Sequence, residues 1–292
     1  MEKPISKSTV FGVGAARFGD LVYVIGRDRS LDQQHVEHSR LIGFDGGKFG
    51  HMGDRNWTAT AIAIAKRPSE RMVVVSEEGA VFTYAAGKHT EEQLTPTPSV
   101  IRSAGVVDGL VYACGMKRQV YRRDEEGRWT DISAPAPAPG TNAGFEAIGG
   151  FAATEVYAAG WAGEIWRWNG AAWTSLGSLT NYILTALCTT DNDVVICGQG
   201  GSLLRGRGQQ WDLVDLGDFA EDLWDVAWYK GQLYMSSMTD LFVLTDDGLQ
   251  SVDFGADRPA TFYRLTQAEG VLWSIGASDI FCFDGSAWKR ID

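Results

Sequence analysis

Short apolar segments recur along the whole chain, and each one ends at glycine, asparagine or aspartate. Three copies are clear: LVYACGMKRQVYRRDEEGRW (110–129), EVYAAGWAGEIWRWNGAAW (155–173) and VLWSIGASDIFCFDGSAW (271–288). Weaker copies lie at 71–88, 193–211 and 232–249, and a first copy begins at residue 21 and is interrupted by an insertion at 26–40. Runs of β-branched and aromatic residues bounded by turn residues predict short strands joined by tight turns.

The copies repeat at a nearly constant interval. Their second apolar positions are Tyr23, Val73, Tyr112, Tyr157, Val195, Tyr234 and Trp273, with spacings of 50, 39, 45, 38, 39 and 39 residues. Seven units of about 42 residues fill the chain, a period typical of β-propellers. We therefore predict an all-β fold, a seven-bladed β-propeller of four-stranded antiparallel blades, in which no helix is needed.

We predict one domain, 1–292, with blades at about 9–52, 57–90, 100–132, 144–177, 182–215, 222–252 and 261–292. Each blade has four strands, labelled A to D in chain order. In the fourth blade we expect them at 146–151, 155–160, 164–168 and 172–176. Strand A is poor in bulky side chains, as in TATAIAIA at 58–65, which fits the innermost strand where blades crowd together.

Tryptophan recurs near the start of the outermost strand, at Trp129, Trp173, Trp211 and Trp288. Because large aromatic rings dominate burial, we interpret these residues as packing between neighbouring blades. Trp166 and Trp168 lie on strand C of the fourth blade. We expect them to face opposite sides of that blade and to serve packing as well.

The repeat itself resembles a known architecture. An apolar-Tyr/Trp-x-x-Gly strand, followed by a hairpin with Asp/Asn-Gly-x-x-Trp, resembles the degenerate propeller repeats of bacterial proteins, among them Kelch-like, sialidase-like and photosystem-assembly-type propellers. The resemblance covers the whole chain and implies architecture alone, since such propellers host binding proteins, lyases and hydrolases. The chain lacks the Gly-His…Trp-Asp pairing of WD40 repeats and the Ser-x-Asp-x-Gly-x-x-Trp box of sialidases.

Charge narrows the range of partners. The formal net charge is −11, which opposes a nucleic-acid partner and attracts a basic protein. No apolar run is long enough to span a bilayer, and the start MEKPISKS does not read as a leader, so we expect a monomeric cytoplasmic protein that does not bind membranes. The four cysteines show no CxxC spacing and are expected to be buried thiols, and we expect no cofactor.

All four histidines lie in the first third of the chain, so metal binding needs a test. His35 and His38, near Asp32 and Glu37 in the 26–40 insertion, are weak candidates for metal ligands. A mobile loop does not supply fixed ligand geometry, so we favour solvated loop histidines. GQGGS at 198–202 joins two strands and precedes no helix, which predicts a β-turn and not a phosphate-binding loop.

No spacing of acids or nucleophiles selects a catalytic set, so we predict a non-enzymatic scaffold for protein binding, such as a cytosolic inhibitor or immunity protein for a basic target. In a propeller, the B–C turns and the D–A connections emerge on one face. The connection at 211–225 holds six acids and no base. Our candidate partner-binding residues on this face are Trp57, Trp161, Asp215, Asp218, Phe219, Glu221, Asp222 and Trp224.

Two alternatives stay open from the sequence. One is a sialidase-like hydrolase or lyase with its site over the central channel. The other is a carbohydrate-binding propeller that uses exposed tryptophans. Convergent polar residues in a deep axial pocket would favour the enzyme, whereas a broad acidic and aromatic surface would favour the protein binder.

Overall fold

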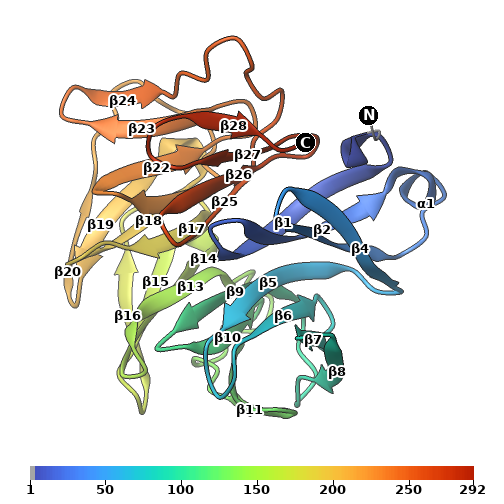
Figure 1. The fold of residues 1–292 in the computed structure, drawn as a ribbon. Coiled ribbons are helices and arrows are strands. Elements are labelled where there is room, and N and C mark those ends of the chain that lie inside the picture. The colour runs from blue at the N-terminus through green and yellow to red at the C-terminus, as the bar shows by residue number, and fades with distance from the viewer. Residues whose placement is uncertain (1–3) are drawn as a thin grey trace. The chain divides into compact units, whose positions relative to one another are not determined.

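The computed structural model describes residues 4–292 and consists almost entirely of β-sheet (Figure 1). Seven four-stranded sheets follow one another, and each is made from four consecutive strands of the chain. The predicted fold class, a seven-bladed β-propeller of four-stranded antiparallel blades, is confirmed. The chain divides into two compact units, one of residues up to Ala59 together with Trp224–Asp292 and the other of Thr60–Leu223. That the two units form a single domain stays a prediction.

The first unit holds blades one, six and seven. Blade one consists of β1 (Thr9–Phe18), β2 (Leu21–Asp28), β3 (Ser39–Asp45) and β4 (Lys48–Arg55). Blade six consists of β21 (Asp225–Tyr229), β22 (Gln232–Ser236), β23 (Leu241–Thr245) and β24 (Gly248–Ser251). Blade seven consists of β25 (Arg264–Ala268), β26 (Val271–Ile275), β27 (Ile280–Phe283) and β28 (Trp288–Arg290).

The second unit holds blades two to five. Blade two consists of β5 (Ala59–Ala65), β6 (Arg71–Ser76), β7 (Ala80–Ala85) and β8 (Lys88–Gln93), and blade three of β9 (Ile101–Val107), β10 (Leu110–Gly115), β11 (Val120–Glu125) and β12 (Arg128–Asp131). Blade four consists of β13 (Phe145–Ala152), β14 (Glu155–Gly160), β15 (Glu164–Trp168) and β16 (Trp173–Ser178), and blade five of β17 (Leu184–Thr189), β18 (Val194–Gly198), β19 (Leu203–Arg207) and β20 (Gln210–Leu213). The strands expected in blade four agree with the observed ones to within two residues.

Small residues on strand A allow the first strands of neighbouring blades to approach closely. A Cβ atom placed on Gly105 of β9 would lie 2.1 Å from the carbonyl oxygen of Ile148 on β13. A Cβ on Gly149 would lie 2.6 Å from Leu187 of β17. Side chains at these positions would push the blades apart, which is the physical reason for the low bulk that the sequence shows.

The strand-D tryptophans bind the preceding blade. The indole nitrogen of Trp129 donates to Glu92 of blade two at 2.8 Å, and that of Trp173 donates to the carbonyl of Ile132, just after blade three, at 2.5 Å. Trp211 packs edge-on against Tyr157 of blade four, with ring centroids 5.8 Å apart. The ring centroid of Trp288 lies 4.8 Å from that of Phe254, which follows blade six. The predicted packing role of these tryptophans is confirmed.

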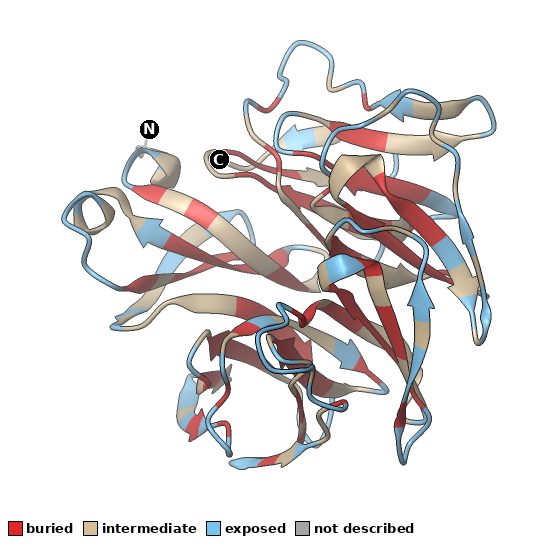
Figure 2. Cartoon of the chain, turned by 180° about the vertical axis from the view of Figure 1, so that it is seen from behind, coloured by how far each residue is buried: buried red, intermediate tan, exposed pale blue. Residues whose placement is uncertain are grey.

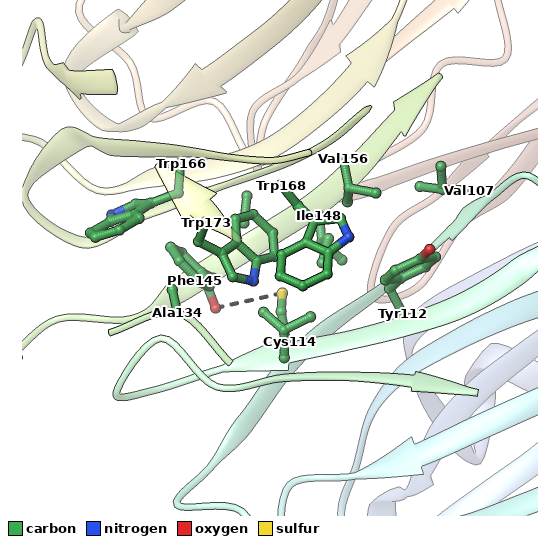
Figure 3. Packing of buried hydrophobic residues seen from close by; sticks show 12 residues of the cluster. Val107, Tyr112, Cys114, Ala134, Phe145, Ile148, Val156, Trp166, Trp168 and Trp173 are labelled. Atoms are coloured by element: carbon green, nitrogen blue, oxygen red, sulfur yellow. Dashed lines mark hydrogen bonds between the residues drawn. The ribbon is translucent and has the colours of Figure 1, made fainter. Parts of the chain in front are cut away.

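Trp166 and Trp168 lie in the same buried cluster between blades three and four, together with Trp173 and Cys114 (Figure 3). The expectation that they face opposite sides of the blade was wrong, because residues two apart in a strand point to the same face. Figure 2 shows how burial follows this arrangement: buried residues run along the strands, and exposed residues gather in the connections.

The 26–40 insertion is ordered by local bonds and contains a helix that the sequence did not predict. The helix α1 (Arg29–Gln33) is capped by the carboxylate of Asp28, which accepts from the amides of Ser30 and Leu31. The hydrogen bonds from Ser30 hold the pKa of Asp28 down, to about 2. A side-chain acceptor at the N-cap satisfies amides that a short helix leaves unpaired, so five residues suffice here.

Candidate functional site

The acidic connection between β20 and β21 is fixed at its C-terminal end. Leu223 is fully buried, its amide donates to the carbonyl of Gly198 at 3.1 Å, and its carbonyl accepts from the Thr185 hydroxyl at 2.6 Å. The preceding residues face solvent: Asp215, Asp218, Glu221 and Asp222 are exposed, and Phe219 is partly buried. The connection is therefore an exposed acidic segment on an anchored backbone.

The B–C turn of blade five, η3 (Gln199–Gly201), holds this segment in place. The amide of Gly200 donates to the carboxylate of Asp222 at 2.9 Å, and the amide of Gly201 donates to the carbonyl of Glu221 at 2.8 Å. GQGGS is thus a turn between strands, as predicted, and its amides bind the protein's own acidic connection. Backbone amides in successive turn positions make an anion-binding concavity, and Asp222 fills it.

Two aromatic rings explain why this turn consists of glycine. Gly200 and Gly201 have φ angles of 61° and 69°, in the left-handed region. A Cβ on Gly200 would lie 2.8 Å from the ring of Tyr182, and one on Gly201 would lie 2.4 Å from the carbonyl oxygen of Phe219 and 3.1 Å from its ring. Glycine is needed both for the backbone conformation and for the close approach of Tyr182 and Phe219.

A second connection borders the same turn. Residues 179–183, between β16 and β17, carry Leu179 and Tyr182, which are 48% and 55% exposed. At its start, the Ser178 hydroxyl donates to the carbonyl of Ala162 at 2.9 Å, in the B–C turn of blade four, η2 (Trp161–Gly163). This connection therefore runs from the turn of blade four to the turn of blade five. Neither Leu179 nor Tyr182 is among the partner-binding residues predicted from the sequence.

Trp161 has an internal hydrogen-bond partner. Its indole nitrogen donates to Glu146 at 2.7 Å, and the same carboxylate accepts two hydrogen bonds from Arg102, at 3.0 and 3.1 Å. The residue is partly buried. These bonds fix the ring orientation at the edge of the surface formed by the two connections. We define the acidic-aromatic surface as Trp161, Leu179, Tyr182, Asp215, Asp218, Phe219, Glu221 and Asp222, all in the second unit.

Trp57 and Trp224 belong to the first unit. The carbonyl of Trp57 accepts from the Ser39 hydroxyl at 2.7 Å. Trp224 donates its amide to the carbonyl of Ser236 at 2.7 Å, and its ring centroid lies 5.8 Å from that of Tyr263. Both tryptophans are partly buried. Their role in partner binding stays a prediction.

Three of the acids in this surface have no arginine or lysine partner in the part of the chain that the structure describes. Among residues 4–292, Asp215, Asp218 and Asp222 form no ion pair; Asp215 and Asp222 accept only from backbone amides, of Gly217 and Gly200 at 2.9 Å each. Such hydrogen bonds orient a carboxylate without cancelling its charge. The negative potential of these acids therefore extends into solvent.

The expectation that His38 is a solvated loop histidine was wrong. His38 is buried, at 5% exposure, its Nε2 accepts from the amide of Asp28 at 2.7 Å, and its Nδ1 lies 2.7 Å from the carbonyl oxygen of Val36. Both ring nitrogens are occupied by backbone groups, so His38 is neither a metal ligand nor a solvated loop histidine. His35 is exposed. In the described part of the chain, no group of three or more histidine, cysteine or acidic side chains is placed to hold a metal ion.

Over the same residues, no helix is long and apolar enough to cross a membrane. Burial raises the pKa of Cys114 well above its ordinary value, and burial likewise raises that of Cys282, so both thiols are kept protonated.

No family model matches the chain. The chain belongs to a family of immune proteins. The relative that shows this is the immune protein Tsi7 of Pseudomonas aeruginosa, which is 42% identical over 293 residues, covering 96% of this chain and 96% of that protein. The predicted class of function, a non-enzymatic immunity protein, is confirmed by this membership, and the hydrolase and lyase alternative is set aside.

Solved structures of low identity show the fold alone. YCF48 bound to a D1 peptide has a TM-score of 0.71 at 13% identity and covers 96% of this chain and 94% of that chain. The WD40 β-propeller domain of Doa1 has a TM-score of 0.70 at 12% identity and covers 97% of this chain and 94% of that chain. The resemblance to β-propeller repeat proteins is confirmed.

Proposed function

We propose that this chain is a monomeric cytoplasmic immunity protein that neutralises a basic protein toxin by binding it through the acidic-aromatic surface. The family of the immune protein Tsi7 supports the class of function. One observation supports the surface: Asp215, Asp218 and Asp222 are exposed and have no cationic partner among the described residues.

Binding of a basic partner would proceed in two stages. Unbalanced acids attract a basic partner over a distance of about a Debye length, ~8 Å at physiological salt, and raise the rate of encounter. Rigid apolar and aromatic side chains then supply contact energy once solvent is expelled. The surface holds both kinds of group, since Tyr182 and Phe219 flank the same turn that binds Asp222.

The carbohydrate-binding alternative needs exposed tryptophans as stacking platforms. Among the described residues, the exposed large apolar side chains include Leu179 and Tyr182 but no tryptophan. Trp166, Trp168 and Trp173 instead pack between blades three and four, and Trp161 donates to an internal carboxylate. This distribution favours a protein partner.

The first experiment identifies the partner. The immobilised wild-type chain captures proteins from a lysate of its source organism, and mass spectrometry identifies them. A captured protein is accepted as the toxin only if its expression arrests growth of a test strain and co-expression of this chain restores growth. A captured protein that fails this growth assay would contradict the proposed function.

The second experiment tests the surface with matched variants. The test variant combines Asp215→Asn, Asp218→Asn, Glu221→Gln and Asp222→Asn. The control combines Asp45→Asn, Asp191→Asn, Asp246→Asn and Asp247→Asn, four exposed acids in A–B and C–D turns, and removes the same charge. We expect the test variant to lower the association rate with the toxin at low salt at least about tenfold, and the control to change it much less. Equal effects of both sets would show that net charge, and not this surface, attracts the toxin.

A further inference from the structure

The acidic-aromatic surface has an apolar part that its charges do not explain. Leu179 and Tyr182 are 48% and 55% exposed, and both lie in the connection between β16 and β17. Exposed large apolar residues are normal when they are scattered singly. Here two occur within four residues, in a connection that borders the B–C turns of both blades four and five.

The ring of Tyr182 packs against the B–C turn of blade five. It rests against the Gly200 backbone, where a Cβ would lie 2.8 Å from ring atoms Cε2 and Cζ. The backbone amide of Tyr182 donates to the Thr180 hydroxyl at 3.2 Å, which fixes the local turn. The residue is nevertheless 55% exposed. A rigid tyrosine offers a large contact area and loses little conformational entropy on binding.

Acidic groups lie next to this ring. Gly200, on which Tyr182 rests, donates its amide to Asp222, and the adjacent Gly201 donates to the carbonyl of Glu221. Leu179 and Tyr182 therefore adjoin the acidic connection through Gly200 and Gly201. An apolar centre with a charged border is the composition of an interface hot spot and its rim.

We propose that Tyr182 and Leu179 form the anchor of the interface, and that the partner presents an apolar recess bordered by lysine or arginine. This proposal rests on the proposed function and specifies the partner's surface. Charge favours a basic protein as the partner. A second copy of this chain would bring Asp215, Asp218 and Asp222 against the same acids in an isologous contact. An anionic membrane would repel these acids too.

Binding variants test the anchor, with the purified toxin as the probe and surface plasmon resonance as the measurement. Tyr182→Ala is expected to raise the Kd about 30-fold, which is typical of a hot-spot residue, mainly through faster dissociation. Leu179→Ser is expected to weaken binding less. The matched control is Val106→Ala: Val106 is 38% exposed but lies at the A–B end of β9, away from the B–C turns, and its variant should bind within about twofold of wild type.

A second pair of variants tests the position of the ring. Gly200→Ala places a methyl group against Tyr182, whereas Gly208→Ala has open space around it. Both glycines have nearly the same φ, 61° and 62°, so both variants carry the same backbone strain. We expect Gly200→Ala to weaken toxin binding and Gly208→Ala to leave it unchanged, at similar thermal stability. Equal binding by the two variants would show that ring position does not matter.

Photo-cross-linking in the source cells completes the test. The cross-linking amino acid p-benzoylphenylalanine replaces Tyr182 in one variant and Val106 in another. We expect a cross-link from position 182 to the toxin and none from position 106. No cross-link from position 182, or one to a second copy of this chain, would overturn the anchor. If the four-acid variant weakens binding but Tyr182→Ala and Leu179→Ser do not, the anchor is wrong and the proposed function stands.

Discussion

Two acid-rich regions of the second unit use their carboxylates in opposite ways. Between blades two and three, the carboxylate of Glu92 accepts from Arg123 at 3.0 and 2.6 Å and from the Trp129 indole at 2.8 Å, and the side chains of the ion pair are only 1% exposed. In the connection between β20 and β21, Asp215 and Asp222 are exposed and accept from backbone amides.

The difference separates acids that join blades from acids that remain exposed to solvent. Glu164 and Glu155 also bind arginines across blade boundaries, Arg118 at 2.8 Å and Arg207 at 2.7 Å. An arginine fixed by such a pair cannot also neutralise the exposed connection. Substitutions in the two regions should therefore have opposite consequences for stability and for binding.

The largest expected effect is on the buried ion pair. Glu92→Ala should lower the free energy of unfolding by about 3–5 kcal/mol, because Arg123 would remain buried without a counter-ion. Urea unfolding followed by tryptophan fluorescence measures it. The control, Glu92→Leu combined with Arg123→Met, should recover most of the loss. A loss below about 1 kcal/mol would place this pair with ordinary surface ion pairs and remove the contrast.

A smaller effect is expected at the boundary of blades three and four. Arg118 donates to Glu164 at 2.8 Å and to the carbonyl of Pro135 at 3.1 Å, and it lies 4.9 Å from the Trp166 ring. Arg118→Ala should lower the free energy of unfolding by about 2 kcal/mol. Arg128→Ala removes an exposed arginine–glutamate pair and should cost less than about 1 kcal/mol. Thermal melts of the two variants measure the difference. Equal decreases in melting temperature for Arg118→Ala and Arg128→Ala would argue against a special role for the blade boundary.

Acid should weaken the same buried contact. Burial acts to raise the pKa of Glu92, but hydrogen bonds from Arg123, the Gly127 amide and Trp129 outweigh it, so the net pKa is below the ordinary 4.5. The folded pKa is the lower one; the contribution to stability is therefore complete above pH 4.5 and is lost as pH falls through the folded pKa. Urea unfolding at pH 6, 4 and 3 should show a steeper loss for wild type than for Glu92→Leu with Arg123→Met.

The smallest effect on stability is expected in the acidic connection. The variant with Asp215→Asn, Asp218→Asn, Glu221→Gln and Asp222→Asn should unfold within about 0.5 kcal/mol of wild type, because these side chains are exposed. A melting temperature equal to that of wild type, together with slower association with the toxin, would show that these acids serve binding and not stability. Marked destabilisation would show that Asp222 is needed mainly to hold the turn of blade five.

The fold could be predicted because its signals are local and repeated. Strand composition, turn residues and the interval between copies occur seven times, so an error in one unit does not change the result. The strand-D tryptophans were assigned correctly for the same reason. The helix α1 was missed because a single capped turn in an insertion leaves no periodic pattern, and His38 was misjudged because its partners are backbone groups.

The candidate site was predicted only in part. The acidic connection is visible as six acids without a base, whereas Tyr182 lies in an ordinary sequence, SLTNYILTA, at 178–186. Its exposure and its fixed ring depend on Gly200, eighteen positions further along the chain, and no local pattern carries that information. The sequence places Trp161 in a B–C turn, but no residue spacing indicates the hydrogen bond from its indole to Glu146.

The four strands of each blade come from one continuous segment, and the carboxylate of Asp292 accepts from the amides of Ile5 and Ser6 at 2.7 and 2.8 Å. A circular permutant could therefore join Asp292 to Pro4 by a short linker and open within residues 132–144, where no strand is formed. Such a permutant would keep every sheet intact. The order in which blades leave the ribosome could then be changed without changing the acidic-aromatic surface, which separates the folding route from the binding function.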